Sequence, residues 1–210
     1  RIMKWYTAIG VKKNTYDGRF CVRIMEEEKI LTGMETEIWS ALLWAFCEEQ
    51  EIRNRVESLL RIAFGENAKK LEEVEVLYCL RRLERRGLIA AVEGEQAKTA
   101  IDRLICSGIM TCVSYHFIQR IPVFLNSMSM GKGLRFSMRA FKKEILTQQE
   151  EKFLKMLETE GSVRKHLERL EGKGKKQEFL KSIRILYIRK QILFKNIEEV
   201  PIKCEIPEVG

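Results

Sequence analysis

Two spacings of apolar residues divide the chain into short strand-like segments and longer helix-like ones. Alternation of apolar and polar residues is typical of half-buried strands, whereas apolar residues three and four apart are typical of amphipathic helices. The N-terminal part therefore predicts a strand, a turn, a second strand, three helices and a short strand. These elements are expected, in that order, at residues 3–11, 12–18, 19–25, 34–50, 51–65, 71–86 and 88–94.

Residues that favour helix ends bound several of these segments. Thr32, Thr147 and Ser162 each precede a helical pattern, and their hydroxyl groups can accept a hydrogen bond from a first-turn amide. Gly65 follows a helical pattern and can adopt the left-handed conformation that often ends a helix. We therefore expect three capped helix starts and one glycine-capped helix end.

The rest of the chain repeats this order of elements after an irregular stretch. A fourth helix is expected over residues 95–108, and residues 109–125 suit one or two strands or a buried helix. Residues 126–133, NSMSMGKG, are the strongest linker candidate because of their glycines. Beyond them we expect a strand, three helices and a strand, at residues 134–146, 147–161, 162–172, 173–191 and 192–200.

Two pairs of segments align without gaps, as expected of an internal duplication. KILTGMETEIWSALL (29–43) lies over EILTQQEEKFLKML (144–157), and EVLYCLRRLERRGLI (75–89) lies over EFLKSIRILYIRKQI (178–192). Strand, strand, helix, helix, helix and wing is the order of a winged-helix domain. The sequence thus predicts an α+β, mostly helical fold with two winged-helix-like units in tandem.

Charge is distributed unevenly between the two predicted units. The chain has 210 residues, 45% of them hydrophobic, and a net charge of +8. Basic and acidic residues cancel over residues 1–116, so residues 117–210 carry the whole excess. We divide the chain into an N-terminal unit at 1–125, the linker at 126–133 and a basic C-terminal unit at 134–210. A surplus of this size favours an anionic partner such as nucleic acid.

The third helix of the C-terminal unit carries the clearest candidate chemistry. A lysine-rich loop leads into a helix whose basic residues include Lys181 and Arg184, and only Glu178 opposes them. Such a face attracts phosphate whatever the base sequence, although a solubilising surface would have the same composition. The candidate DNA-binding residues are Lys173, Lys175, Lys176, Lys181, Arg184, Arg164 and Lys165.

The third helix of the N-terminal unit has a different charge pattern. Four arginines between residues 81 and 86 form a stripe near its end. They suit phosphate or carboxylate contact, or simply a solvated face that complements the helix dipole. Three glutamates between residues 72 and 75 lie at its start, where a recognition helix approaches the bases. This helix is therefore predicted to be a poor reader of the major groove.

The N-terminal unit combines a β-hairpin with the segments ILTGMETEIWSALL, VESLLRIAFG and VEVLYCLRRLERRGLI. Over residues 19–93 this pattern resembles the small peptide-chaperone domain of pyrroloquinoline-quinone biosynthesis, which is also the leader-recognition element of ribosomal peptide-modifying systems. The resemblance implies that a leader peptide adds as a strand to the hairpin edge and packs on the third helix. The residues of this alternative site are Phe20, Val22, Arg23, Arg81 and Arg85.

Motifs for a reaction, a cofactor or a metal ion are missing from the sequence. The six cysteines form no CxxC pair, and the two histidines lack ligand-spaced neighbours. An apolar run of transmembrane length and a signal peptide are also missing. We therefore expect a cytoplasmic, non-enzymatic protein without cofactor, metal ion or membrane partner.

These patterns lead to two functional hypotheses, beside the third possibility of a structural adaptor with no DNA or peptide ligand. The first is a DNA-binding transcriptional regulator that contacts double-stranded DNA through its basic C-terminal unit. The alternative is a leader-peptide-binding protein of a ribosomal-peptide modification pathway. A peptide or protein partner at the N-terminal unit and a second copy of the chain are further expected partners.

Overall fold

The computed structural model describes residues 2–14, 18–65, 71–113 and 146–198. Over these residues the chain is an α+β protein with more helix than strand, and its paired strands run antiparallel. The predicted α+β, mostly helical class is confirmed at this level. The predicted strand at 134–146 and the linker at 126–133 lie outside the described residues, apart from Leu146.

The first part of the chain is a three-stranded sheet packed against three helices. Its elements are β1 (Met3–Ala8), α1 (Met34–Leu42), β5 (Cys47–Glu48), α2 (Glu49–Phe64), α3 (Glu73–Arg85) and β6 (Ile89–Gly94). β1 is the central strand and pairs with β5 on one side and β6 on the other. Trp39, Val56 and Leu80 from the three helices are buried in one core cluster with Tyr6 of β1. Burial of these apolar faces is the main term that stabilises the sheet and helices together.

A second small sheet is inserted between β1 and α1. It consists of β2 (Val11–Asn14), β3 (Phe20–Ile24) and β4 (Glu27–Leu31), with β3 in the middle. Val22 and Leu31 are buried in the same core as Trp39, so the small sheet lies against α1.

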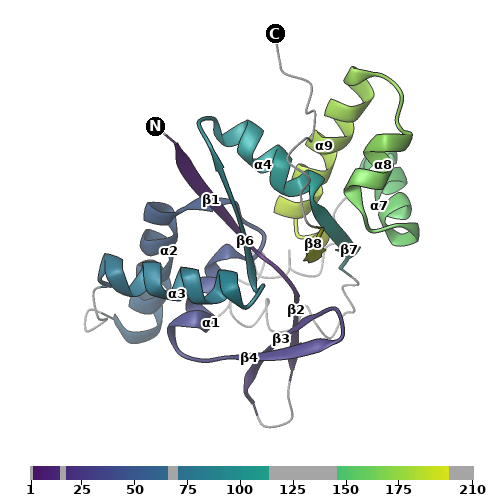
Figure 1. The fold of residues 1–210 in the computed structure, drawn as a ribbon. Helices are drawn as coiled ribbons and strands as arrows, with labels where there is room; N and C mark the ends of the chain where they lie inside the picture. The colour runs from purple at the N-terminus through teal and green to yellow at the C-terminus, as the bar shows by residue number, and fades with distance from the viewer. Residues whose placement is uncertain (1, 15–17, 66–70, 114–145, 199–210) are drawn as a thin grey trace, which may run out of the picture.

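The second part of the chain packs its helices around a two-stranded sheet. Its elements are α4 (Ala97–Cys106), β7 (Gly108–Cys112), α7 (Gln148–Thr159), α8 (Val163–Arg169), α9 (Lys173–Ile188) and β8 (Ile192–Ile197). β7 pairs with β8, and Ile109 of β7 forms a bridge to Ser162 on its other side. Figure 1 shows α1, α2 and α3 gathered on one side of the molecule and α7, α8 and α9 on the other.

The two parts share one order of elements. A central strand (β1 or β7) precedes a helix (α1 or α7), a short edge pairing (β5 or Ser162), two helices (α2 and α3, or α8 and α9) and a second edge strand (β6 or β8). We call residues 3–94 the first repeat and the described part of residues 108–197 the second repeat, with α4 between them.

The third helices of the two repeats also end in the same way. In the first repeat, the amide of Leu88 donates to the carbonyl of Leu83 at 2.9 Å, and Gly87 has a φ of 67°. In the second, the amide of Gln191 donates to Leu186 at 2.9 Å, although the positive φ of 62° falls on Lys190. Both helices therefore end with a residue in the left-handed conformation. Glycine adopts this conformation readily, whereas the lysine of the second repeat does so at a cost in free energy.

Tyr187 of α9 joins the repeats. Its hydroxyl lies 2.7 Å from the Thr7 hydroxyl of β1 and accepts a hydrogen bond from the Trp44 amide at 3.0 Å. The Gly10 amide donates to the Phe194 carbonyl of β8 at 2.8 Å. These contacts fix the second repeat against the first through buried groups.

The strand predicted over residues 3–11 is in fact two strands in different sheets. The chain turns at Gly10, which has a φ of 101° and is buried beside Val22. A side chain with a Cβ would rarely adopt this conformation. The hairpin expected between residues 3–11 and 19–25 is therefore shorter, and pairs only β2 with β3.

The first predicted helix, 34–50, was too long and its predicted cap was wrong. α1 ends at Leu42, and Trp44 has a φ of 59°. Gly33, not Thr32, occupies the N-cap position, without a side-chain hydrogen bond. Thr147 and Ser162 are confirmed as N-caps, with hydroxyl oxygens that accept from the amides of residues 150 and 165. Gly65 is confirmed as the C-cap of α2.

The predicted boundary at residue 125 lies outside the described residues, so the division of the chain there remains a prediction. β7 forms its sheet with β8, and Leu104 and Ile105 of α4 are buried in the same cluster as Phe179 of α9. α4 also packs on β1 and β6 of the first repeat, and Ala90 of β6 lies in the same cluster, so α4 contacts both parts of the chain.

Candidate nucleic-acid interface

α9 presents one apolar face to the core and one polar face to solvent. The buried face consists of Phe179, Leu180, Ile183, Leu186 and Tyr187, at the three-and-four spacing of an amphipathic helix. The helix starts after Gly172, which has a φ of 88° and offers no side-chain cap. Its first turn contains no acidic residue. No carboxylate of that turn therefore offsets the free amides, the positive end of the helix dipole or the neighbouring lysines.

The exposed start of α9 brings several of the predicted DNA-binding lysines together. Lys173, Lys175 and Lys181 are exposed, and Lys176 is half-buried. Within the part of the chain that the structure describes, Lys175, Lys176 and Lys181 form no ion pair with a carboxylate. Glu178 is the acidic residue of this helix, and it is exposed one turn after Lys175.

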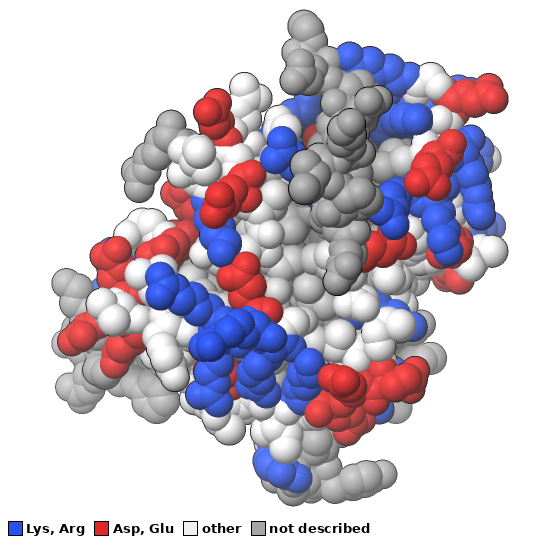
Figure 2. Space-filling model, viewed as in Figure 1, with Lys and Arg blue, Asp and Glu red and all other residues white. Residues whose placement is uncertain are grey.

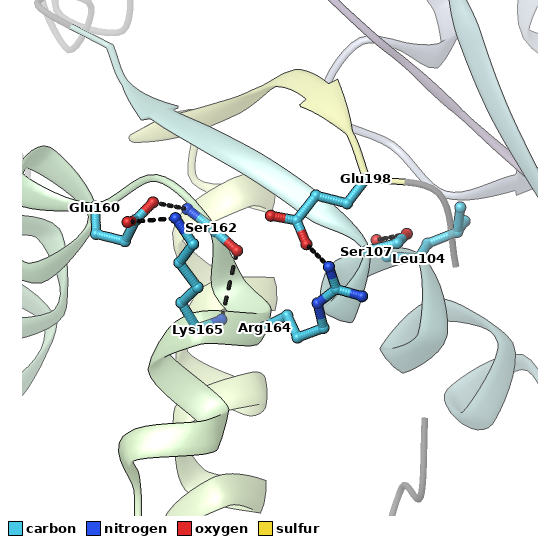
Figure 3. Close-up of polar contacts among 7 residues, drawn as sticks. All are labelled: Leu104, Ser107, Glu160, Ser162, Arg164, Lys165 and Glu198. Atoms are coloured by element: carbon cyan, nitrogen blue, oxygen red, sulfur yellow. Dashed lines mark hydrogen bonds and ion pairs between the residues drawn. The ribbon is translucent and has the colours of Figure 1, made fainter. Parts of the chain in front are cut away.

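Three other predicted DNA-binding residues are already neutralised by neighbouring acids. Arg184 forms an ion pair with Asp102 of α4 at 2.5 Å, and Arg164 pairs with Glu198 at 2.6 Å. Lys165 pairs with Glu160 at 2.9 Å. Figure 3 shows the last two pairs around the start of α8.

Glu160 organises the start of α8 as well as binding Lys165. Its carboxylate accepts from the Ser162 amide at 3.2 Å, and its carbonyl lies 2.6 Å from Nε2 of His166. The hydrogen bond from Lys165 and that from the Ser162 amide lower the pKa of the Glu160 carboxyl. Lys165 is thus held by the Glu160 carboxylate, and this ion pair helps to order the start of α8.

The single basic surface expected around Lys181 and Arg184 is therefore smaller than predicted. Figure 2 shows basic atoms over α8 and α9 interspersed with acidic ones. What remains is a narrower candidate interface, formed by the lysines in the first three turns of α9. We call Lys173, Lys175, Lys176 and Lys181 the α9 lysine cluster.

The corresponding helix of the first repeat has the opposite polarity at its start. Glu72 and Glu75 form a capping box there, and Glu73 lies in the first turn. The arginine stripe at its other end has two faces. Arg82 and Arg86 both bind the buried carboxylate of Glu35, at 2.9 and 2.7 Å.

Arg81 and Arg85 are exposed, and with Glu84 they line a shallow depression. The largest continuous basic patch in the view of Figure 2 lies over α3. The prediction that the start of α3 is poorly suited to phosphate agrees with these acidic residues, but it remains a prediction.

The residues of the alternative peptide site do not form one accessible surface. Val22 is fully buried, and Phe20 packs edge-on against Trp39 with ring centres 5.7 Å apart. Arg23 is exposed, but β3 already pairs with β2 and β4. A peptide cannot add as a strand to β3, because both of its edges are occupied. β2 and β4 are the edge strands of this sheet, and peptide addition at their outer edges remains a prediction.

Other reactive groups of the described residues are mostly buried. Burial raises the pKa of the Cys47 thiol to about 12 and that of Cys112 to about 11. In the described ranges, three or more histidine, cysteine, aspartate or glutamate side chains do not gather into a group able to hold a metal ion. Among the described helices, none has the length and apolarity needed to cross a membrane.

The acids that neutralise Arg184 and Arg164 were missed by the sequence analysis. Asp102 precedes Arg184 by 82 residues. Glu198 pairs with Arg164 of α8, but α9 and β8 lie between the two residues in the sequence. One signal was present, since Asp102 lies three and four residues before Ile105 and Cys106, on the face of α4 that is buried. The chain matches no protein-family model, and no curated protein or solved structure is significantly similar to it.

Proposed function

We propose that the protein is a non-enzymatic, DNA-binding transcriptional regulator and that the α9 lysine cluster contacts the DNA backbone. The observation that supports this most strongly is the exposure of Lys175 and Lys181 on a helix whose first turn contains no acidic residue. Lysines placed in this way attract phosphate as point charges, with no need for a defined base sequence.

The shared order of elements supports treating each repeat as a winged-helix-like unit. In a helix-turn-helix arrangement the recognition helix enters the major groove with its N-terminal residues closest to the bases. α9 occupies this position in the second repeat, and its start is basic and exposed. α3 occupies it in the first repeat, where Glu73 and Glu75 would repel phosphate. The second repeat is thus the DNA-binding unit of this proposal.

A charge-reversal experiment tests this assignment. The K175E/K181E double variant changes two exposed lysines that form no ion pair among the described residues, so its folding should be preserved. We expect its affinity for random duplex DNA at low salt to fall by at least about tenfold, because two phosphate contacts are replaced by repulsion. Fluorescence anisotropy of a labelled duplex measures the effect.

The R61E/K98E double variant is the matched control. Arg61 of α2 and Lys98 of α4 are exposed, and the substitution changes the net charge by the same amount. We expect this control to bind nearly as well as the wild type. An equal loss of binding in both variants would indicate a general charge effect, and no loss in K175E/K181E would remove α9 from the proposal.

A further inference from the structure

One face of the first repeat carries a basic patch and an acidic patch next to each other. The basic patch is formed by the exposed Arg81 and Arg85 of α3. The acidic patch is formed by Glu26 and Glu27 at the turn between β3 and β4. Figure 2 shows the basic patch over α3 directly bordering an acidic patch near the β4 end of the molecule.

Neither patch is neutralised by its neighbour. Of the described residues, Arg81, Arg85 and Glu26 form no ion pair, and Glu27, whose side chain is 76% exposed, reaches Lys29 at 3.3 Å. Exposed charges of both signs therefore remain available to a partner on the same face.

Hydrogen bonds between the end of α3 and β4 fix the distance between the two patches. Arg86 donates to the Ile30 carbonyl of β4 at 2.7 Å, and Lys29 donates to the Arg86 carbonyl at 2.7 Å. Arg82 and Arg86 also share the Glu35 carboxylate. The end of α3 and the edge strand β4 thus form one rigid platform, which lowers the entropic cost of binding a partner.

The platform also exposes apolar side chains at both of its ends. Val74 and Tyr78 of α3 are 73% and 60% exposed, and they continue the helix face that carries Arg81 and Arg85. Met25 at the β3–β4 turn is 43% exposed and has a φ of 52°. A positive φ costs free energy for a methionine, and an exposed tyrosine beside arginines is typical of binding surfaces.

We propose that this face is a homodimer interface with a two-fold axis between the basic and acidic patches. In a two-fold interface each copy presents the same surface, so a patch on one copy meets a different patch on the other. Arg81 and Arg85 of each copy would then face Glu26 and Glu27 of its partner, with Met25 directed toward Tyr78. Duplex DNA and acidic peptides fit less well, because the acidic turn beside the arginines would repel them.

A charge-swap experiment tests this interface. Sedimentation velocity of the wild type should show a dimer that dissociates as salt is raised, because the facing charges are exposed. In R81E/R85E and in E26R/E27R alone, like charges face each other twice, and we expect the dimer dissociation constant to rise at least about tenfold. An equimolar mixture of the two variants pairs opposite charges at both contacts and should restore the dimer.

The mixture is the decisive measurement, because misfolded chains would not recover the dimer. A wild type that stays monomeric, variants that still dimerise, or a mixture that stays monomeric would each overturn the proposal. A monomeric wild type that binds an acidic peptide or DNA through Arg81 and Arg85 would assign the face to that partner. The dimer does not depend on the α9 lysine cluster, so K175E/K181E should dimerise as the wild type does.

Discussion

Tyr187 carries a hydroxyl group whose hydrogen bonds can be assigned completely. The Thr7 hydroxyl donates to the Ala45 carbonyl at 2.9 Å, which uses its only proton. Tyr187 must therefore donate to Thr7, while it accepts from the Trp44 amide. One buried residue of the second repeat thus contacts both β1 and the segment that follows α1 in the first repeat.

Removing this hydroxyl should destabilise the protein. Tyr187→Phe leaves the Trp44 amide without its acceptor, and we expect a loss of about 1–3 kcal/mol in the free energy of unfolding. Urea denaturation at neutral pH measures this loss. A variant as stable as the wild type would show that the hydroxyl does not link the repeats.

The same residue predicts a loss of stability at alkaline pH. Burial raises the pKa of Tyr187 above its ordinary value, so the folded protein keeps a proton that the unfolded chain loses above about pH 10. The contribution of the protonated Tyr187 to the free energy of unfolding is complete below that pH and decreases as the pH rises. The stability difference between wild type and Tyr187→Phe should therefore shrink between about pH 9 and pH 11. A difference that is constant with pH would contradict this.

Cys47 should be almost unreactive in the folded protein. It is fully buried, and its raised pKa lowers the thiolate fraction at pH 8 about a thousandfold relative to an exposed thiol. Mass spectrometry after iodoacetamide treatment should find Cys47 modified only in denaturant, and the half-buried Cys79 modified earlier. Equal rates at Cys47 and Cys79 without denaturant would argue against this packing.

At the scale of elements, the sequence predicts what depends on local pattern and misses what depends on distant contacts. Apart from α1, which ends well before its predicted end, the helices were predicted close to their positions because their apolar spacing is regular. β4 was missed because Glu27, Glu28 and Lys29 have the composition of a loop, yet they pair with β3. The turn at Gly10 depends on the Phe194 carbonyl, far along the chain.

The candidate site follows the same rule. The exposed lysines of α9 could be predicted, because their helix is amphipathic and its inward face is plain from the spacing. The neutralisation of Arg184 could not, since Asp102 reaches it only through the packing of α4 on α9.

Two glycines with positive φ should respond differently to alanine. At Gly87 a Cβ would meet nothing within 4 Å, so Gly87→Ala should cost only the left-handed conformation, about 1–2 kcal/mol. At Gly10 a Cβ would lie 2.5 Å from Val22 and 2.9 Å from the Arg23 carbonyl. Gly10→Ala should therefore be clearly more destabilising, as measured in urea. Similar losses at both positions would contradict the described turn.

At the scale of the whole molecule, the two repeats share contacts that should make them unfold together. Trp44 and Phe46 of the first repeat belong to the core cluster of the second, and Phe46 packs on Tyr187 with ring centres 5.0 Å apart. All three tryptophans lie in the first repeat, whereas the helices lie in both. Tryptophan fluorescence and far-ultraviolet circular dichroism should therefore give the same unfolding midpoint. Two separate midpoints would show that the repeats are independent domains.

The central claim is that DNA lies on the start of α9. Lysine acetylation followed by mass spectrometry, with and without random duplex DNA, tests it directly, because each exposed lysine reports its own protection. We predict that DNA reduces labelling of Lys175 and Lys181 severalfold and leaves Lys12 and Lys98 unchanged. Unchanged labelling of Lys175 and Lys181 in a mixture where the DNA is bound would contradict the claim.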